Sequence, residues 1–173
     1  MQMAKLSPNQ IITLNDFPVH NEHVLKIFFK IYQNKCGKIV PPVPIMHKNL
    51  VLTYLHGNMK NKSNEFYKRN PNCNYFMLDG SHRTTAATLT KKKIKVMVLQ
   101  HGQDVQKARK MVETGELFHF YLKDTIEDIV KELIAHFRKT GFFQTVEQKT
   151  KRMVIEKVIP LYMIEYYKKW ATL

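Results

Sequence analysis

The sequence predicts an α+β protein with a small mixed β-sheet flanked by helices and a helical C-terminal extension. Two apolar runs rich in strand-forming residues, at 75–80 and 93–100, flank a short stretch compatible with a helix. The C-terminal third instead carries apolar residues at helical spacing. Apolar residues make up 44% of the 173-residue chain, which is enough for one well-buried core.

The N-terminal elements follow from local signals. The β-branched residues of 11–17 predict a short strand that ends near Pro18. Asn21 can cap a helix that stops at Gly37. Three prolines in the following segment exclude a central helix there and favour an edge or entering strand at 43–47. The run "NLVLTYL", residues 49–55, is a further strand candidate.

The middle of the chain predicts a strand–helix–strand unit. The segment 57–74 is polar, basic and rich in Asn, and it reads as a loop or lid. The strands at 75–80 and 93–100 then flank a short helix that begins near Ser81. This βαβ order is typical of a parallel or mixed sheet.

The C-terminal region predicts helices that pack on the sheet or form a small appended bundle. A helix starts near Gln103, and Asp124 or Thr125 can cap the next one, which ends at Gly141. Its apolar stripe consists of Ile126, Ile129, Val130, Leu133, Ile134 and Phe137. A last helix at about 147–170 is expected to kink at Pro160. We therefore expect an α/β domain at 1–102 and a helical region at 103–173 packed on it.

The charge composition bounds the partners. Lysine and arginine number 28 against 14 aspartate and glutamate residues, a formal net charge of +14. This excess predicts attraction to nucleic acid, nucleotide phosphates or anionic membrane surfaces, although it also suits a solvated surface. No run approaches the roughly 18 apolar residues of a spanning helix, and no signal peptide is seen, so we expect a cytoplasmic protein. Cys36 and Cys73 suggest neither a disulfide nor a zinc site.

The turn after the 75–80 strand carries most of the chemistry. A strand that leads into a helix N-terminus exposes unpaired backbone N–H groups and the positive end of the helix dipole. Gly80 lets a ligand approach the backbone, Ser81 can cap the helix, and His82 and Arg83 add donors for phosphate oxygens. The turn therefore predicts a phosphate cradle. The alternative is a plain Asp-Gly turn with Ser81 as a helix cap.

Asp79 needs its own explanation because a carboxylate repels an anion. It could bind Mg²⁺ beside the phosphates, activate a hydroxyl group, or accept hydrogen bonds from Arg83 and the loop backbone.

The stretch "LDGSHRTTAATL", residues 78–89, resembles the D-G-x-H-R-x-x-A signature of the ParB/sulfiredoxin superfamily. The resemblance continues back through "VHNEHVLKIFFKIYQNKCGKIVPPVPI" and forward to "KIKVMVL", and covers roughly the first 100 residues. It implies a nucleotide-binding domain at 1–102. Sulfiredoxin carries its catalytic cysteine where this chain has Ser81, so that chemistry is not expected. Segregation-type ParB proteins carry G-E-R-R at this turn, and "DGSHR" departs from it.

Within the superfamily, the chain is most similar to the free serine kinase branch, through the pairs Glu22-His23 and Asp79-Gly80 with Arg83. This resemblance implies phosphoryl transfer from ATP or ADP, or from CTP, with Mg²⁺, to a small hydroxylated metabolite. Glu22 would be the catalytic base, and Asp79 would assist the hydroxyl or bind the metal. The nucleotide would be held by Gly80, Ser81, His82, Arg83 and Thr84. The other substrate would be held by His23, Lys149, Thr150 and Arg152, although Met153 stands where the branch prefers histidine.

Other functions stay open at this point. Glu22 can equally be a first-turn acid that stabilises its helix dipole. A nucleic-acid-binding protein or ParB-like nuclease would use the basic segment 57–74, with Phe66 and Tyr67, and the "KKKIK" run at 91–95. That run can also be a solvated helix end, where cations are favoured. Further alternatives are a nucleotide-dependent phosphohydrolase and a nucleotide-sensing module without turnover.

Overall fold

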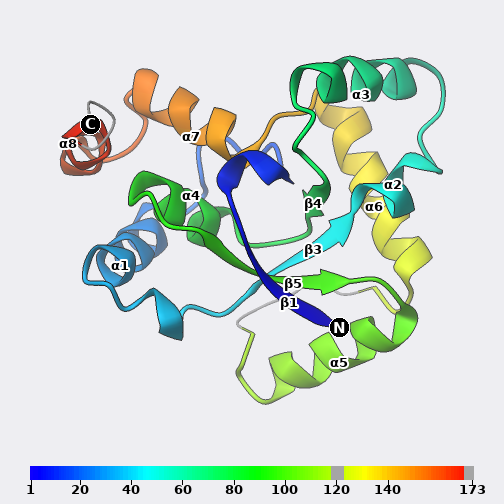
Figure 1. Cartoon of the computed structure of the whole chain (residues 1–173), viewed down its shortest axis with the longest axis horizontal. Coiled ribbons are helices and arrows are strands. Elements are labelled where there is room, and N and C mark those ends of the chain that lie inside the picture. The colour runs from blue at the N-terminus through cyan, green and yellow to red at the C-terminus, as the bar shows by residue number, and fades with distance from the viewer. Residues whose placement is uncertain (118–122, 170–173) are drawn as a thin grey trace.

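A five-stranded mixed β-sheet lies at the centre of the protein, in a computed structural model that describes residues 1–117 and 123–169 (Figure 1). The strand order is β1-β5-β3-β4-β2. The strands are β1 (Gln2–Leu6), β2 (Ile11–Ile12), β3 (Val43–His47), β4 (Tyr75–Met77) and β5 (Ile94–Leu99). The predicted α+β fold with a mixed sheet is therefore confirmed.

The sheet is mixed because its strand pairs alternate in direction. β1 runs antiparallel to β5, β5 parallel to β3, β3 antiparallel to β4, and β4 parallel to β2. β4, α4 (Ser81–Leu89) and β5 form the predicted strand–helix–strand unit. Its two strands nevertheless run in opposite directions. β3 lies between them, and it is antiparallel to β4 and parallel to β5.

β3 is the central strand, so the expectation of an edge or entering strand at 43–47 is wrong. Pro44 is tolerated there because of where β4 stops. The carbonyl of Pro44 accepts a hydrogen bond from the N–H of Leu78, one residue beyond the end of β4 at Met77. A residue's N–H and C=O point to the same side of a strand, so the N–H that proline lacks would face a place where the β3–β4 ladder has ended.

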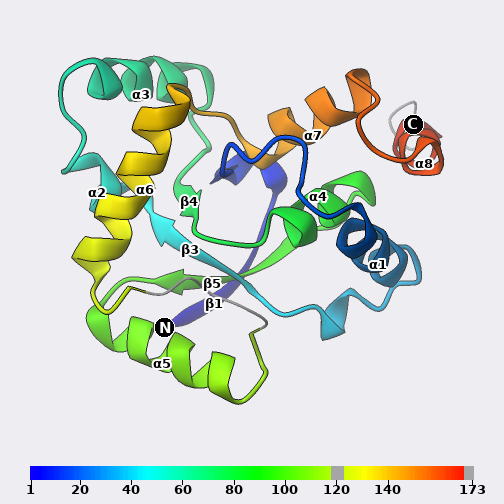
Figure 2. The same ribbon diagram turned by 180° about the vertical axis from the view of Figure 1, so that it is seen from behind.

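Helices cover both faces of the sheet, and the two helical layers lie to the left and right of the strands in Figure 1 and exchange sides in Figure 2. One layer contains α1 (Glu22–Gln33), α4, α7 (Val146–Ile155) and α8 (Leu161–Lys169). Their apolar side chains form one core cluster with Ile45 of β3 and Val96 of β5. The other layer contains α2 (Lys48–Leu52), α3 (Gly57–Arg69), α5 (Gly102–Glu113) and α6 (Ile126–Thr140). These helices pack on the opposite face of the sheet, around Phe76 and Met97. Short 3-10 turns are η1 (Pro8–Gln10) and η2 (Gly37–Ile39).

Two predicted helices begin at the predicted caps. The side chain of Asn21 accepts hydrogen bonds from the N–H groups of His23 and Val24 at the start of α1. Thr125 accepts one from Asp128 at the start of α6, which ends at Gly141 in the left-handed conformation that glycine adopts without a Cβ clash. A cap and its helix interact within a few residues, so these boundaries are local properties of the sequence.

Two segments were assigned wrongly because their packing decides their structure. Residues 57–74 contain helix α3 rather than a loop, since Met59, Ser63 and Phe66 repeat at helical spacing and Phe66 is buried. The strand expected at 49–55 is instead the short helix α2. The side chain of His47 accepts a hydrogen bond from the N–H of Asn49 at its start, and Val51 is buried beneath it.

Other segments differ in length, among them the helix expected to stop at Gly37, which ends at Gln33. The strand expected at 11–17 is only the two residues of β2, and the chain then leaves the sheet as a loop. The helix expected at 147–170 is interrupted rather than kinked, because α7 ends at Ile155 and α8 starts at Leu161, directly after Pro160. Trp170, the expected end of that helix, lies outside the described residues.

The C-terminal helices share their cores with the rest of the chain. Val146 and Met153 of α7 lie in the same cluster as Phe29 of α1, and Phe137 of α6 packs edge-on against Phe76 of β4. None of the described helices combines the length and the apolar character needed to cross a membrane.

Candidate functional site

The loop from 13 to 21, which joins β2 to α1, passes beside the N-terminus of α4 (Figure 2). Asn15 fixes this loop to the segment around the end of α6. Its side-chain amide donates to Thr140 Oγ1 and to the carbonyl of Phe142, and its Oδ1 accepts from Gln144. Its backbone N–H donates to Nε2 of His136 at 3.0 Å. Side chain and backbone of Asn15 therefore both fix the loop to the end of α6 and the segment after it.

A buried charged cluster joins this loop to α4 and α7. Oδ1 of Asp16 accepts a hydrogen bond from Lys149 Nζ at 2.6 Å and another from Ser81 Oγ at 2.8 Å. The side chain of Lys149 is 1% exposed and that of Asp16 13%. Burial lowers the pKa of Lys149 below its ordinary value, and the carboxylate of Asp16 opposes this shift. Three chain segments that are distant in sequence thus meet at one carboxylate.

Gly80, and not Ser81, is the N-cap of α4, so the expected serine cap is wrong. The hydroxyl of Ser81, the first residue of the helix, donates to Asp16 instead, and no described side chain caps α4. Gly80 has a φ of 109°, and an added Cβ would lie 3.0 Å from Cγ2 of Val43. The backbone N–H groups of the first turn have no partner within the helix.

Arg83 is buried, and both terminal nitrogens of its guanidinium donate to the protein. Its guanidinium donates to the carbonyls of Pro41 and Pro42, the latter at 2.8 Å, and to Oδ2 of Asp79 at 2.7 Å. The side chain of Arg83 is 5% exposed, whereas that of Asp79 is 41% exposed. Arg83 therefore fixes the turn against the chain before β3, and Asp79 presents its other oxygen to solvent.

His82 connects the turn to the start of α1. Its Nε2 accepts a hydrogen bond from the N–H of Asn21 at 3.1 Å, so the proton of the neutral ring lies on Nδ1. Burial lowers the pKa of His82 below its ordinary value, with Asp16 opposing that shift. Glu22, the next residue, begins α1, and its carboxylate is 2.5 Å from Lys26 Nζ. The backbone of Glu22 thus follows Asn21 next to the turn, but Glu22 is not among the residues that line the cavity to which Asp79 and His82 contribute.

A cavity of about 410 Å³ lies between α1 and this turn. One wall is the apolar face of α1, and the other is the turn itself. The lining residues are Val24, Ile27, Phe28, Ile31, Asp79, Gly80, His82 and Arg83. Its volume falls within the range of small-molecule sites.

The remaining predicted residues occupy varied places. Thr84 is buried, and its hydroxyl donates to the carbonyls of Gly80 and Ser81. Thr150 is also buried and donates to the carbonyl of Val146 within α7. The guanidinium of Arg152 stacks over Phe17 of the loop at 3.5 Å from the ring centroid. His23 is exposed in the first turn of α1.

The described residues contain no cluster of three or more His, Cys, Asp or Glu side chains that could hold a metal ion by themselves. Mg²⁺ seldom needs such a cluster, because it binds through one or two carboxylates together with the phosphates of a substrate. The exposed oxygen of Asp79 beside the helix N-terminus fits that second mode.

Sequence reasoning missed Asp16, Asn15 and His136. The "ND" pair before Phe17-Pro18 is a turn signal, and it could have shortened the strand expected at 11–17. Nothing local, however, indicates that Asp16 meets Lys149, which is 133 residues away.

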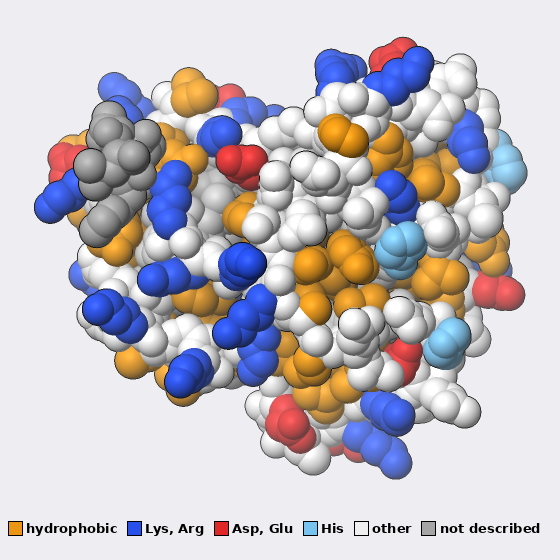
Figure 3. Space-filling model, in the orientation of Figure 1, with side chains coloured by type: hydrophobic (Ala, Val, Ile, Leu, Met, Phe, Trp, Pro, Cys, Tyr) orange, Lys and Arg blue, Asp and Glu red, His pale blue; other side chains and the backbone are white. Residues whose placement is uncertain are grey.

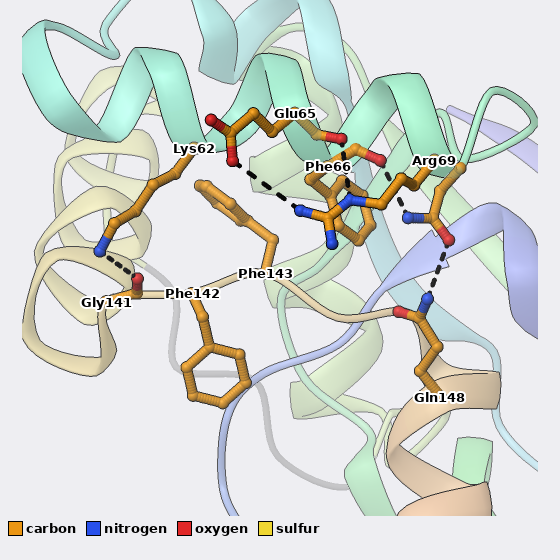
Figure 4. A pocket seen from close by; sticks show the side chains of 9 residues that line it. Lys62, Glu65, Phe66, Arg69, Gly141, Phe142, Phe143 and Gln148 are labelled. Atoms are coloured by element: carbon orange, nitrogen blue, oxygen red, sulfur yellow. Dashed lines mark hydrogen bonds and ion pairs between the residues drawn. The ribbon is translucent and has the colours of Figure 1, made fainter.

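A second cavity, of about 320 Å³, lies between α3 and the segment that joins α6 to α7 (Figure 4). Its polar groups satisfy one another. Lys62 donates to the carbonyl of Gly141 at 2.7 Å, Arg69 pairs with Glu65, and Gln148 donates to Asn70. The contact between Gln148 and Asn70 holds the start of α7, which carries Lys149, against the end of α3.

Comparison of the chain with protein-family models, with curated proteins and with solved structures gave no match.

Proposed function

We propose that the protein binds a nucleotide, ATP or ADP, at the turn between β4 and α4 and transfers a phosphoryl group to a small hydroxylated metabolite. The observation that carries the proposal is the cavity in which the apolar face of α1 lies opposite the N-terminal turn of α4. An apolar wall suits a nucleoside base, and a helix N-terminus suits phosphate oxygens. The resemblance of "DGSHR" to the ParB/sulfiredoxin signature points to the same turn.

The phosphates would be held chiefly by the backbone. The unpaired N–H groups of the first turn of α4 and Nδ1–H of His82 are the donors available to an anion. Arg83 has a positioning role in this proposal, because its guanidinium already bonds Pro41, Pro42 and Asp79. Asp79 would supply one oxygen to Mg²⁺ carried by the nucleotide, and the ion would neutralise the phosphate oxygens.

Glu22 would be the base that accepts the proton of the attacking hydroxyl. It begins α1 directly after Asn21, whose N–H contacts His82, so it lies at the end of α1 nearest the turn. Its carboxylate is 55% exposed and pairs only with Lys26 among the described residues, and it is therefore accessible to a substrate. Phosphoryl transfer depends mainly on positioning and charge neutralisation, and these groups would supply both.

The test measures phosphate transfer from ATP and from ADP, with Mg²⁺, to serine and to other small hydroxylated acceptors by phosphorus NMR. Glu22→Gln should lower transfer at least 100-fold while leaving the nucleotide-induced rise in Tm unchanged. Glu147→Gln is the matched control, because Glu147 also lies in the first turn of a helix and pairs with a lysine four residues on. Transfer that survives Glu22→Gln would exclude Glu22 as the base.

A second pair of variants tests the cavity itself. Ile27→Asp places a charge on the apolar wall and should weaken nucleotide binding at least tenfold, whereas Ile155→Asp changes another exposed isoleucine, outside the cavity, and should not. Equal nucleotide affinity in both variants would overturn the proposal that the nucleoside base binds against the apolar face of α1.

A further inference from the structure

A basic hollow of about 660 Å³, which we call the lysine hollow, shares no lining residue with the cavity proposed to bind the nucleotide. Its lining residues are Lys5, Tyr32, Lys35, Gly37, Lys38, Lys92, Lys93 and Lys95. Figure 3 shows Lys and Arg side chains gathered on the part of the surface where α1, η2 and the β1 edge of the sheet lie in Figure 1.

The hollow is assembled from three separate stretches of the chain. Lys35 and Lys38 follow α1, Lys92 and Lys93 lie in the turn after α4, and Lys5 belongs to β1. The "KKKIK" run is divided by this arrangement, because Lys91 turns away and its Nζ lies 4.0 Å from the ring centroid of Tyr167 on α8. The concentration of charge is thus a property of the fold, beyond the single run of lysines in the sequence.

No ion pair joins any of the six lysines of the hollow to an acidic group among the described residues. Lys5 and Lys95 are moreover directly opposite each other in the β1–β5 ladder. Like charges in opposite positions on adjacent strands destabilise a sheet. The chain therefore maintains a repulsive cluster that an anionic partner would relieve.

We propose that the lysine hollow binds the phosphate backbone of double-stranded nucleic acid without sequence preference. Lysine is a compact point charge, and its contacts to phosphates carry no sequence information. Proteins that hold single strands add exposed aromatic side chains for base stacking, and the only aromatic residue of this lining, Tyr32, is 5% exposed. A concave site also fits a projecting backbone better than it fits a flat membrane surface.

The salt dependence of binding tests this proposal quantitatively. If all six lysines contact phosphates, the slope of log K against log salt concentration should be about −5, and affinity should fall roughly 10³-fold between 50 and 200 mM salt. Fluorescence anisotropy with a 20-base-pair DNA of random sequence, measured without nucleotide, gives both numbers. A slope weaker than about −2 would overturn the proposal.

A charge-matched pair of variants locates the contact. The triple variant Lys38→Gln, Lys92→Gln and Lys93→Gln should weaken duplex binding at least tenfold and reduce the steepness of the slope by about 3. The control variant Lys107→Gln, Lys110→Gln and Lys139→Gln removes the same charge from exposed positions of α5 and α6, and should leave the slope unchanged. Equal effects of the two variants would mean diffuse attraction by the net charge and no site.

A comparison of different anionic ligands tests which class of partner the lysine hollow binds. The wild-type protein is compared on the duplex, on a single strand of equal length, on inorganic polyphosphate and on vesicles containing phosphatidylserine. Tighter binding of the single strand, of polyphosphate or of the vesicles than of the duplex would overturn the assignment. Because Glu22→Gln and Ile27→Asp lie outside the hollow, they should leave duplex binding unchanged, so that this proposal and the proposed phosphoryl transfer succeed or fail separately.

Discussion

Asp16 and Lys149 form a buried ion pair, 2.6 Å from Oδ1 to Nζ, that ties the loop after β2 to helix α7. The same carboxylate oxygen accepts the hydroxyl of Ser81 at the first residue of α4. The pair therefore lies directly beneath the turn that carries Asp79 and His82. A substitution in this ion pair should therefore alter both the free energy of unfolding and the position of that turn.

Removing one member of this pair should be costly. Asp16→Asn leaves the ammonium of Lys149 buried without a counter-charge, and we expect a loss of about 3 kcal/mol in the free energy of unfolding by urea denaturation. Adding Lys149→Met to that variant should recover part of the loss, because the buried charge is then gone. The surface pair Glu147–Lys151 provides the control, because Glu147→Gln should lower the free energy of unfolding by less than about 1 kcal/mol. A loss below 1 kcal/mol for Asp16→Asn would contradict this account.

Arg83 should behave as a structural residue. Arg83→Met leaves the carbonyls of Pro41 and Pro42 without their donor, and we expect a loss of roughly 3 kcal/mol, or a Tm lowered by about 6–12 °C. Arg83→Lys should lose nearly as much, because an ammonium cannot reproduce the fork of the guanidinium. Arg138→Met on the exposed end of α6 should shift the Tm by less than 2 °C. Calorimetry of the three variants distinguishes these outcomes.

Stability should fall as the pH drops below about 6.5. Burial lowers the pKa of both His82 and His136 from the ordinary value of 6.5, so below that pH the unfolded chain takes up protons that the folded protein resists. Both Nε2 atoms accept backbone N–H groups, from Asn21 and Asn15, and protonation would break these bonds. Urea denaturation between pH 8 and 5 should show that the free energy of unfolding falls as the pH is lowered. This fall should be smaller in His82→Gln and in His136→Gln than in the wild type. An unchanged pH profile in the double variant would refute this origin.

Gly80 should not tolerate a side chain. Gly80→Ala combines a φ of 109° with a Cβ only 3.0 Å from Val43 Cγ2, and we expect a loss of about 2–3 kcal/mol. In Gly102→Ala the new Cβ meets no heavy atom within 4 Å, and the residue begins α5 without a positive φ, so stability should be unchanged or slightly raised. Thermal unfolding of both variants checks the contrast, and equal Tm values would argue against the tight turn.

The part of the fold that could be predicted from the sequence was the part fixed by local signals. Asn21 and Thr125 act on N–H groups two or three residues away, so a reader of the sequence could place α1 and α6. Helix α3 escaped prediction because its polar composition hides a narrow apolar stripe around Phe66, which matters only once α6 and its following loop pack against it. The tolerance of Pro44 in the central strand β3 likewise depends on where β4 stops.

The candidate site shows the same division. Gly80 could be read as a special turn position because its role is conformational and local. The partners of Asp16 could not be read, because Ser81 and Lys149 are 65 and 133 residues away and only the folded sheet brings them together. Arg83 could be recognised as important, but whether its donors face a ligand or the carbonyls of Pro41 and Pro42 depends on the path of the chain before β3.

Because Lys5 and Lys95 lie opposite each other in the β1–β5 ladder, the stability of this edge of the sheet should depend on the dissolved salt. Mobile anions that gather between Lys5 and Lys95 screen their repulsion, and that screening weakens as the Debye length grows from about 8 Å in physiological saline to about 30 Å at 0.01 M. In dilute buffer the outermost strand should therefore be the first to exchange its amide hydrogens. This edge of the sheet should therefore become more stable as salt is added.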